Sequence, residues 1–281
     1  MLLVLCLVGL GLGIVLNSLA DNLPPDAEDR RYPPRRPRCR ACGQPYAPIY
    51  WLALAHGLLR GGRCDHCGAR RPVRPLVVEL ACAVVLPYLW LWAGQPVDGV
   101  LLAALPMAVR FLAGATVVTV CILIVVIDIE HRLILWSVVW PAAIAIALLG
   151  VVTPGHGFEK TVLGGLAGYG ITLSIFLLAE LFARLVQRWR GQPLDEVAFG
   201  GGDVNLAAII GLAVGWPGII LSLMIAVFAG GLFSLAYIVV QLLRRRYVPY
   251  SAVPYGPFLV LGALSIYLYG KDLAALWLAG R

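Results

Sequence analysis

Hydrophobic residues are concentrated in eight long runs along the chain, separated by polar stretches. The runs cover residues 1–20, 76–93, 107–127, 133–151, 161–183, 204–216, 218–242 and 256–269. About 20 apolar residues cross the hydrocarbon of a bilayer as a helix, and most of the runs approach or exceed this length. The sixth and eighth runs are shorter. The pattern predicts an all-α polytopic membrane protein with about eight transmembrane helices.

Composition supports the same class of protein. Hydrophobic residues make up 60% of the 281 residues and charged residues only 13%. The mean hydropathy is +0.87. These values lie far outside the range of ordinary soluble domains. The apolar runs are too many and too long for one buried core, so we expect a membrane protein.

The first run predicts the orientation in the membrane. No basic residue precedes it and many follow it, which is the reverse of a secretory signal peptide. An uncleaved helix with its N-terminus outside places loops 21–75, 128–132, 184–203 and 243–255 in the cytosol. These loops hold most of the Lys and Arg residues, as the positive-inside rule requires. The net charge of +7 is then explained by the anionic inner leaflet, without a nucleic-acid partner.

The largest loop, residues 21–75, contains two C-x-x-C pairs. The four residues are Cys39, Cys42, Cys64 and Cys67. Each pair is followed by glycine, and two such turns can present four thiolates tetrahedrally to one zinc ion. Disulfides are the alternative, but a cytosolic loop lies in a reducing compartment. His56 and His66 could also bind metal, although four cysteines already complete the shell.

The predicted zinc is structural. This arginine-rich loop has little apolar surface to bury, so a metal cross-link gives it a reason to fold. Four cysteines leave no open position for catalysis. We therefore divide the chain into a first transmembrane helix (1–20), a cytosolic zinc-binding loop domain (21–75) and a transmembrane core (76–281).

Two acidic residues at the edge of the membrane are candidate catalytic groups, because charges beside spanning helices are costly. Asp128 and Asp203 each lie at the cytosolic end of an apolar run, and two crossings between them return the chain to the same side. At about 4 Å and an effective dielectric near 20, two carboxylates repel by about 4 kcal/mol, or about three pK units. They would share one proton and provide the acid and base of an aspartic protease.

Three glycines precede the second acid in "AFGGGDVNLA", residues 198–207. Glycine permits unusual dihedral angles and the close approach of a substrate backbone. The alternative is that Asp203 caps a helix beginning near Val204. Other glycines have the spacing of helix-packing contacts in membranes. They are Gly9, Gly11, Gly13, Gly164, Gly168, Gly211 and Gly215.

Several ordered motifs resemble those of the prepilin peptidases, the type IV leader peptidases of pilus and type II secretion systems. They are "IVLNSLADNLP" with Asn17, "RPLVVEL" with Glu79, "VIDIEHRLI" with Asp128, "GGGDVN" with Gly200, Gly202 and Asp203, and "VPYGPFL" near the end. The resemblance covers nearly the whole chain, and the order of the motifs is more specific than any one of them.

The resemblance implies an aspartic endopeptidase of the bacterial inner membrane. It would cut the basic leader of type IV prepilins or pseudopilins at the cytosolic face, with Asp128 and Asp203 as the catalytic pair and the four cysteines on zinc. It also implies N-methylation of the new N-terminus with S-adenosylmethionine, whose binding residues the sequence does not identify. Leu135, Asn205 and Asn22 depart from the family pattern and bear on substrate handling and methylation.

Two other functions fit parts of the pattern. An ion-coupled transporter could use paired acids, although these acids lie at the membrane edge and the chain has no clear internal repeat. A non-catalytic assembly scaffold could use the cysteine loop for docking. Finally, the loop has one acidic cluster that could contact a basic leader. It consists of Asp26, Glu28 and Asp29.

Overall fold

The computed structural model describes residues 1–24, 36–94, 107–152, 157–190, 200–245 and 254–279. The acidic cluster at Asp26, Glu28 and Asp29 lies outside these residues. The described chain is almost entirely helical, and its only β pairing consists of two isolated bridges.

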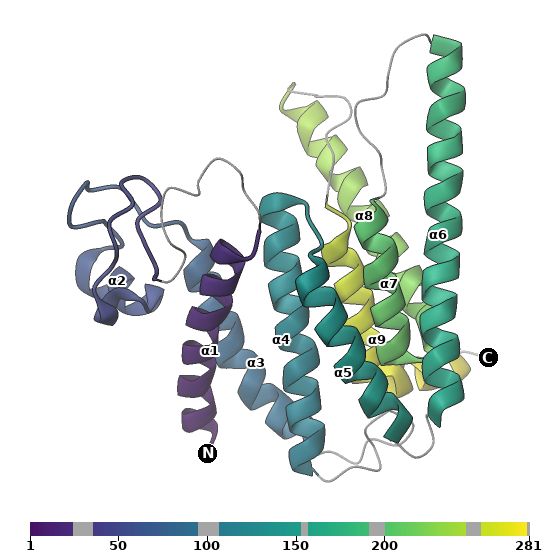
Figure 1. Ribbon diagram of the computed structural model, residues 1–281, viewed down its shortest axis with the longest axis horizontal. Helices are drawn as coiled ribbons and strands as arrows, with labels where there is room; N and C mark the ends of the chain where they lie inside the picture. The colour runs from purple at the N-terminus through teal and green to yellow at the C-terminus, as the bar shows by residue number, and fades with distance from the viewer. Residues whose placement is uncertain (25–35, 95–106, 153–156, 191–199, 246–253, 280–281) are drawn as a thin grey trace. The chain divides into compact units, whose positions relative to one another are not determined.

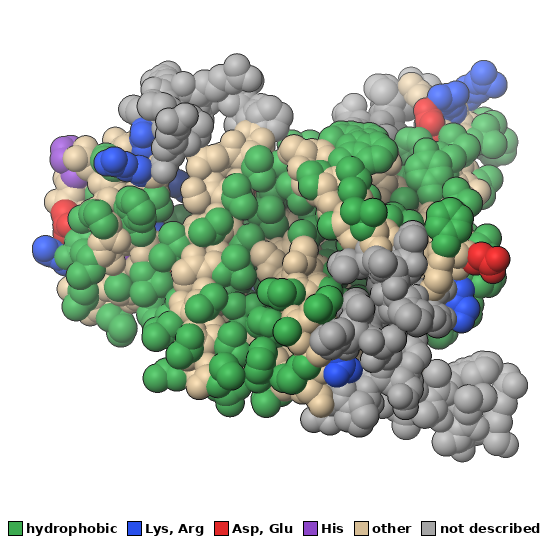
Figure 2. Space-filling model, turned by 60° about the horizontal axis from the view of Figure 1, so that its bottom comes forward, with side chains coloured by type: hydrophobic (Ala, Val, Ile, Leu, Met, Phe, Trp, Pro, Cys, Tyr) green, Lys and Arg blue, Asp and Glu red, His purple; other side chains and the backbone are tan. Residues whose placement is uncertain are grey.

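All eight predicted runs form helices. Five are long and apolar enough to cross a membrane, namely α1 (Leu2–Asn22), α3 (Arg74–Ala93), α4 (Met107–His131), α6 (Gly157–Arg190) and α8 (Gly218–Leu243). The other three have shorter apolar stretches, namely α5 (Trp136–Val152), α7 (Gly201–Val214) and α9 (Gly256–Ala279). The prediction of an all-α, multi-pass membrane protein is confirmed. On the face in Figure 2, hydrophobic side chains predominate and charged ones lie mostly at the margins.

Helix boundaries differ from the predicted runs at the polar ends. Helix α4 continues through the predicted loop 128–132 as far as His131, and the amide of Arg132 still donates to the carbonyl of Asp128 at 2.9 Å. Helix α6 reaches Arg190, well past residue 183. Helix α7 begins at Gly201, before Val204. Hydropathy marks where hydrocarbon ends, whereas backbone hydrogen bonds decide where a helix ends.

The chain forms two compact units, and the first comprises residues 1–95 and 114–127. In this unit α1 lies along α3 (Figure 1). A Cβ on Gly9 would strike the carbonyl of Cys82, and one on Gly13 would lie 2.6 Å from the Cα of Glu79. These two glycines pack helices as predicted. The prediction is wrong for Gly11, which has open space around it.

The second unit comprises residues 96–113 and 128–281. Helix α7 is its centre, since it packs against α5, α6, α8 and α9. Its closest partner is α6, because Gly164 of α6 and Gly211 of α7 face each other so tightly that a Cβ on either would strike the other's carbonyl. Gly168 meets the carbonyl of Ala207 in the same way. The predicted packing role is confirmed here, and it explains how a helix as short as α7 is held inside the unit.

Candidate functional site

The second candidate acid lies in the first turn of α7. Asp203 is the third helical residue, is 8% exposed, and accepts a hydrogen bond from the amide of Gly200 at 3.1 Å. The carboxylate therefore caps α7 from its third position, by binding the amide of the N-cap residue Gly200. The alternative interpretation was wrong in detail, because Asp203 lies inside the helix and does not precede a helix beginning near Val204. One oxygen, Oδ2, makes this bond, so capping still leaves the other oxygen for chemistry.

Of the three glycines before Asp203, Gly202 serves close packing, whereas Gly201 has open space around it. Gly200 has φ −89° and ψ 151°, which any residue can adopt, and neither Gly201 nor Gly202 has a positive φ. The expected unusual dihedral angles are therefore wrong. At Gly202 a Cβ would lie 3.0 Å from the Cβ of Ile134. Glycine here lets the start of α7 approach the segment that precedes α5.

The first candidate acid lies in the last turn of α4. Asp128 is 5% exposed, and its Oδ2 accepts a hydrogen bond from the amide of Gly256 at 3.1 Å. Gly256 is the first residue of α9. A Cβ at this position would collide with the same Oδ2 and lie 3.0 Å from the Cγ of Asp128. Only glycine allows α9 to begin this close to the carboxylate.

The two acids lie in the same region of the second unit, where three helix ends converge: Gly256 binds Asp128, and Gly202 contacts Ile134, six residues after Asp128. The charge of Asp128 acts on the carboxyl group of Asp203, so the groups are within electrostatic reach. Tyr255, next to Gly256, is half-buried; burial raises the pKa of its hydroxyl, and the charge of Asp203 raises it further. Residues 255 and 256 thus connect to both acids. Both residues belong to the motif "VPYGPFL", but the sequence alone predicted no role for them at the site.

This arrangement is suited to acid–base chemistry. Helix N-termini and amide hydrogen bonds favour an ionised carboxylate, whereas burial and a neighbouring negative charge oppose ionisation of both groups at once. Two carboxyl groups under these conditions can share one proton. One can then accept a proton from water while the other donates one.

The three departures from the family pattern make local contacts. The Asn205 amide donates to the carbonyl of Gly201 at 3.1 Å, one turn back in α7. The carbonyl of Leu135 accepts the amides of Val138 and Val139, both at 3.0 Å, at the start of α5. Near the end of α1, Asn22 donates to the hydroxyl of Ser18 at 3.3 Å. None of these hydrogen bonds involves an acid of the pair.

The four cysteines form a metal-binding cluster in the first unit. All four sulfur atoms lie within 4.8 Å of one another. The Cys39 and Cys67 sulfurs are 3.6 Å apart, and those of Cys42 and Cys64 are 3.8 Å apart. A tetrahedron with zinc–sulfur bonds of about 2.3 Å places its sulfurs about 3.8 Å apart. The geometry fits a four-thiolate metal ion and does not fit a disulfide, whose sulfurs are about 2 Å apart.

Two equivalent turns position these cysteines. In the first, the amide of Gly43 donates to the carbonyl of Cys39 at 2.9 Å; in the second, Gly68 donates to Cys64 at the same distance. Gly43 and Gly68 have φ of 73° and 70°, a conformation that favours glycine. The glycine after each pair is therefore required by the turn that aims the thiolates inward.

Neither histidine joins the cluster. His56 is fully buried, with its Nε2 3.1 Å from the carbonyl of Arg63 and its ring beside Tyr46 and Tyr50. It packs the small core of the loop. His66 is exposed within the second turn. Among the described residues the metal cluster consists of the four cysteines.

Glu79 and Asn17 attach this loop to the helices. Glu79 is fully buried in α3 and accepts the amides of Ala53 and Leu54, at 2.8 and 3.1 Å, which begin α2 (Ala53–Arg60). Asn17 of α1 donates to the carbonyl of Pro75 at 3.0 Å. Both residues therefore stand at the junction between the loop and the membrane helices.

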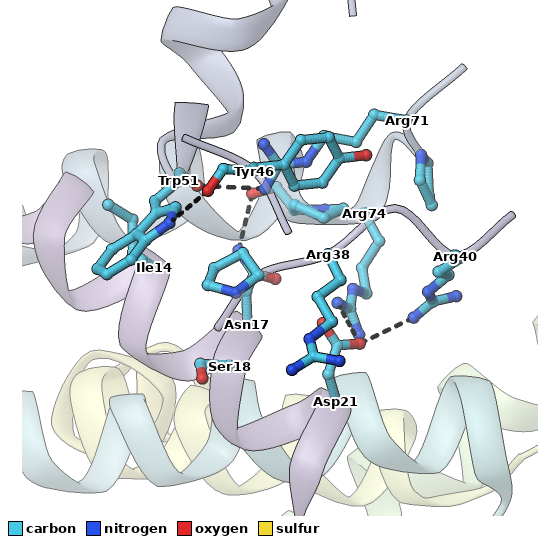
Figure 3. A pocket seen from close by; sticks show the side chains of 13 residues that line it. Ile14, Asn17, Ser18, Asp21, Arg38, Arg40, Tyr46, Trp51, Arg71 and Arg74 are labelled. Carbon is cyan, nitrogen blue, oxygen red and sulfur yellow. Dashed lines mark hydrogen bonds and ion pairs between the residues drawn. The ribbon is translucent and has the colours of Figure 1, made fainter. Parts of the chain in front are cut away.

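A small hollow of about 30 Å³ marks the same junction (Figure 3). At its edge one oxygen of Asp21 in α1 pairs with Arg40 at 3.0 Å and with Arg74 at 2.8 Å. Across the hollow, Arg71 donates to the carbonyls of Tyr50 and Trp51. We call residues 36–73 the cysteine module. Hydrogen bonds and ion pairs attach this module to α1 and α3.

Fold and site together define a multi-pass helical membrane protein with a buried acid pair at helix ends and a separate cysteine module. Two family models match the chain. The model described as the type IV leader peptidase family matches residues 115–235, which include both acids. The model of the bacterial peptidase A24 N-terminal domain matches residues 7–93, which include all four cysteines. The chain belongs to the type IV leader peptidase family.

Curated relatives carry the name prepilin leader peptidase/N-methyltransferase. The relative from Aeromonas salmonicida (strain A449) is 23% identical over 265 residues, covering 92% of this chain and 81% of the relative. The relative from Pseudomonas putida is 28% identical, covering 85% and 73%. The relative from Bacillus subtilis (strain 168) is 23% identical, covering 86% and 85%. No solved structure matches the chain.

Proposed function

We propose that this protein is an aspartic endopeptidase that removes the basic leader of type IV prepilins or pseudopilins, with Asp128 and Asp203 as its catalytic pair. One observation carries the proposal. The end of α4 and the starts of α7 and α9 bring together two buried carboxyl groups, each accepting a backbone amide. The family and the names of the relatives supply the substrate class.

In this mechanism the ionised acid accepts a proton from a water molecule, which attacks the carbonyl carbon of the scissile peptide. The protonated acid donates its proton to the leaving nitrogen, so the pair regains its single shared proton. The amides of Gly200 and Gly256 hold one oxygen of each carboxyl group and so orient the other. No step requires a metal ion or a covalent intermediate.

Placement of the acids favours a peptidase over a transporter. Both lie in the last or first turn of a helix rather than halfway along a span. The basic residues in the predicted inner loops support a cytosolic site. A leader that carries Lys and Arg would be present on that side. The bacterial inner membrane is what the resemblance to the family implies.

Purified full-length protein incubated with a prepilin tests the proposal, with mass spectrometry of the product. We expect Asp128→Asn and Asp203→Asn each to reduce the cleavage rate by about 10²-fold to 10⁴-fold, the range for general acid–base groups. The matched control is Glu180→Gln, an α6 acid paired with Arg184 away from the pair, which should cleave normally. Unchanged cleavage by either Asp variant, or none by wild type, would refute the proposal.

Two further parts of the proposal concern the metal ion and a second activity. We propose that the four cysteines hold zinc as a structural ion, supported by the sulfur spacing. We also propose, from the names of the relatives, that the enzyme transfers a methyl group from S-adenosylmethionine to the new N-terminus. A labelled methyl donor, with mass analysis of the cleaved pilin, measures this activity separately from cleavage.

A further inference from the structure

Helix α2 has one face packed in the cysteine module, and exposed apolar side chains lie outside that face. Ala53 and His56 are buried on the inner face. At 100° per residue, Leu58 lies about 170° from the centre of this inner face, and Leu59 lies about 90° from it, on the flank of the helix. They are 78% and 61% exposed, and Ile49 in the preceding turn is 61% exposed. We call these three residues the leucine face.

The hydrogen bonds between α2 and Glu79 determine how deep α2 lies relative to the membrane. Glu79 lies five residues after Arg74, where α3 begins, and a helix rises 1.5 Å per residue, so Glu79 is about 7 Å along the axis. The first amides of α2 bind its carboxylate. Helix α3 has 20 residues, about the length that spans the hydrocarbon. The start of α2 therefore lies beside α3 below its polar end, at the level of the membrane interface.

The surfaces beside α2 combine exposed apolar residues with arginines, as expected of a surface that contacts the membrane interface. On α3, Val77 is 57% exposed, and Val73 just before the helix is 70% exposed, so an apolar surface already faces outward at this level. Three exposed arginines of the cysteine module can reach lipid phosphates while their stems lie against apolar surface. They are Arg60, Arg63 and Arg70. The acid near them, Asp65, lies 3.5 Å from Arg60 and leaves the group positively charged.

We propose that α2 is an interfacial helix whose leucine face inserts at the boundary between headgroups and acyl chains of the adjacent leaflet, with anionic phospholipid as its partner. Short helices with an apolar face and flanking arginines bind membranes in this way. The lipid contact would hold the cysteine module against the membrane from the side opposite its metal-binding core. The proposal does not depend on peptidase or methyltransferase activity.

Full-length protein in nanodiscs of phosphatidylglycerol and phosphatidylethanolamine tests the proposal. An environment-sensitive fluorescent amino acid replaces Leu59, and the matched control carries it at Gln44, an exposed position in the first cysteine turn. Genetic incorporation leaves the cysteines untouched. With bromine on the acyl chains, we expect a loss of emission at position 59 and none at position 44. Thermal melting in detergent verifies that each labelled protein folds like wild type.

Further outcomes of these experiments distinguish lipid from protein partners and test the role of lipid charge. Equal emission at position 59 with and without brominated lipid overturns the proposal. A photo-crosslinking residue at position 58 should capture lipid; capture of added prepilin or of a second copy, without lipid, would overturn it in favour of a protein partner. Replacing phosphatidylglycerol with neutral lipid should reduce the quenching at position 59, because the arginines then lose their anionic partners.

Discussion

The cysteine module and the acid pair are built in opposite ways. The module draws its four ligands from two similar turns in one loop, and each turn needs only local hydrogen bonds and a glycine. The acid pair draws on three helices, and one of its hydrogen bonds joins residues 128 positions apart in the chain. A site built from one loop can be predicted from the spacing of its residues. For a site assembled from distant helices, the sequence predicts the individual residues but not the contacts between them.

The two regions also use glycine differently. Gly43 and Gly68 adopt positive φ, so their lack of a side chain relieves backbone strain. Gly202 and Gly256 have no positive φ; they instead leave space for Ile134 and for the carboxylate of Asp128. The same residue thus provides conformational freedom in the module and close approach at the acid pair.

The largest expected effect comes from removing a metal ligand. Cys39→Ser should lose the metal ion, because structural zinc contributes about 10–16 kcal/mol to folding in small zinc domains. We expect cleavage to persist, since the acids belong to the other compact unit. Loss of methylation without loss of cleavage would place the methyltransferase activity in the cysteine module. Metal analysis and the two activity assays measure this. If cleavage disappears together with the metal, the two regions are not independent.

Filling the space at Gly256 should damage the acid pair alone. In Gly256→Ala the new Cβ meets the Asp128 carboxylate, and a displacement of about 1 Å can reduce a rate by about 10²-fold. Metal content should not change. Gly170→Ala is the control, because this α6 glycine has open space around it. Equal cleavage rates in the two variants would mean that Gly256 does not position Asp128.

The smallest effect is expected at the junction of the module with α3. Glu79→Gln keeps the size of the side chain but replaces one acceptor oxygen with a donor, so one α2 amide loses its partner at a cost of about 1–3 kcal/mol. Hydrogen exchange at Ala53 and Leu54 should become faster. Glu180→Gln provides a control that also loses one carboxylate. Unchanged exchange would show that Glu79 does not anchor α2.

Much of this architecture was predictable because membrane insertion depends on local composition. Eight apolar runs gave eight helices, and the spacing of Gly164 with Gly168 predicted a packing face. Helix limits were less predictable: α4 and α6 continue past their apolar runs. At Asp203 the sequence left capping and catalysis as alternatives. The structure shows the cap, and the two roles are compatible because capping occupies only one oxygen.

By itself the sequence determined the class of protein, the four cysteines and the two acids as candidates, because hydropathy and metal-ligand spacing are local properties. Tertiary structure decided what those residues contact. It placed Gly256 on Asp128, Gly202 on Ile134 and Glu79 on the start of α2. Such contacts depend on how helices pack, and packing is set by the shapes of surfaces distant in the chain. No spacing rule could therefore have located them.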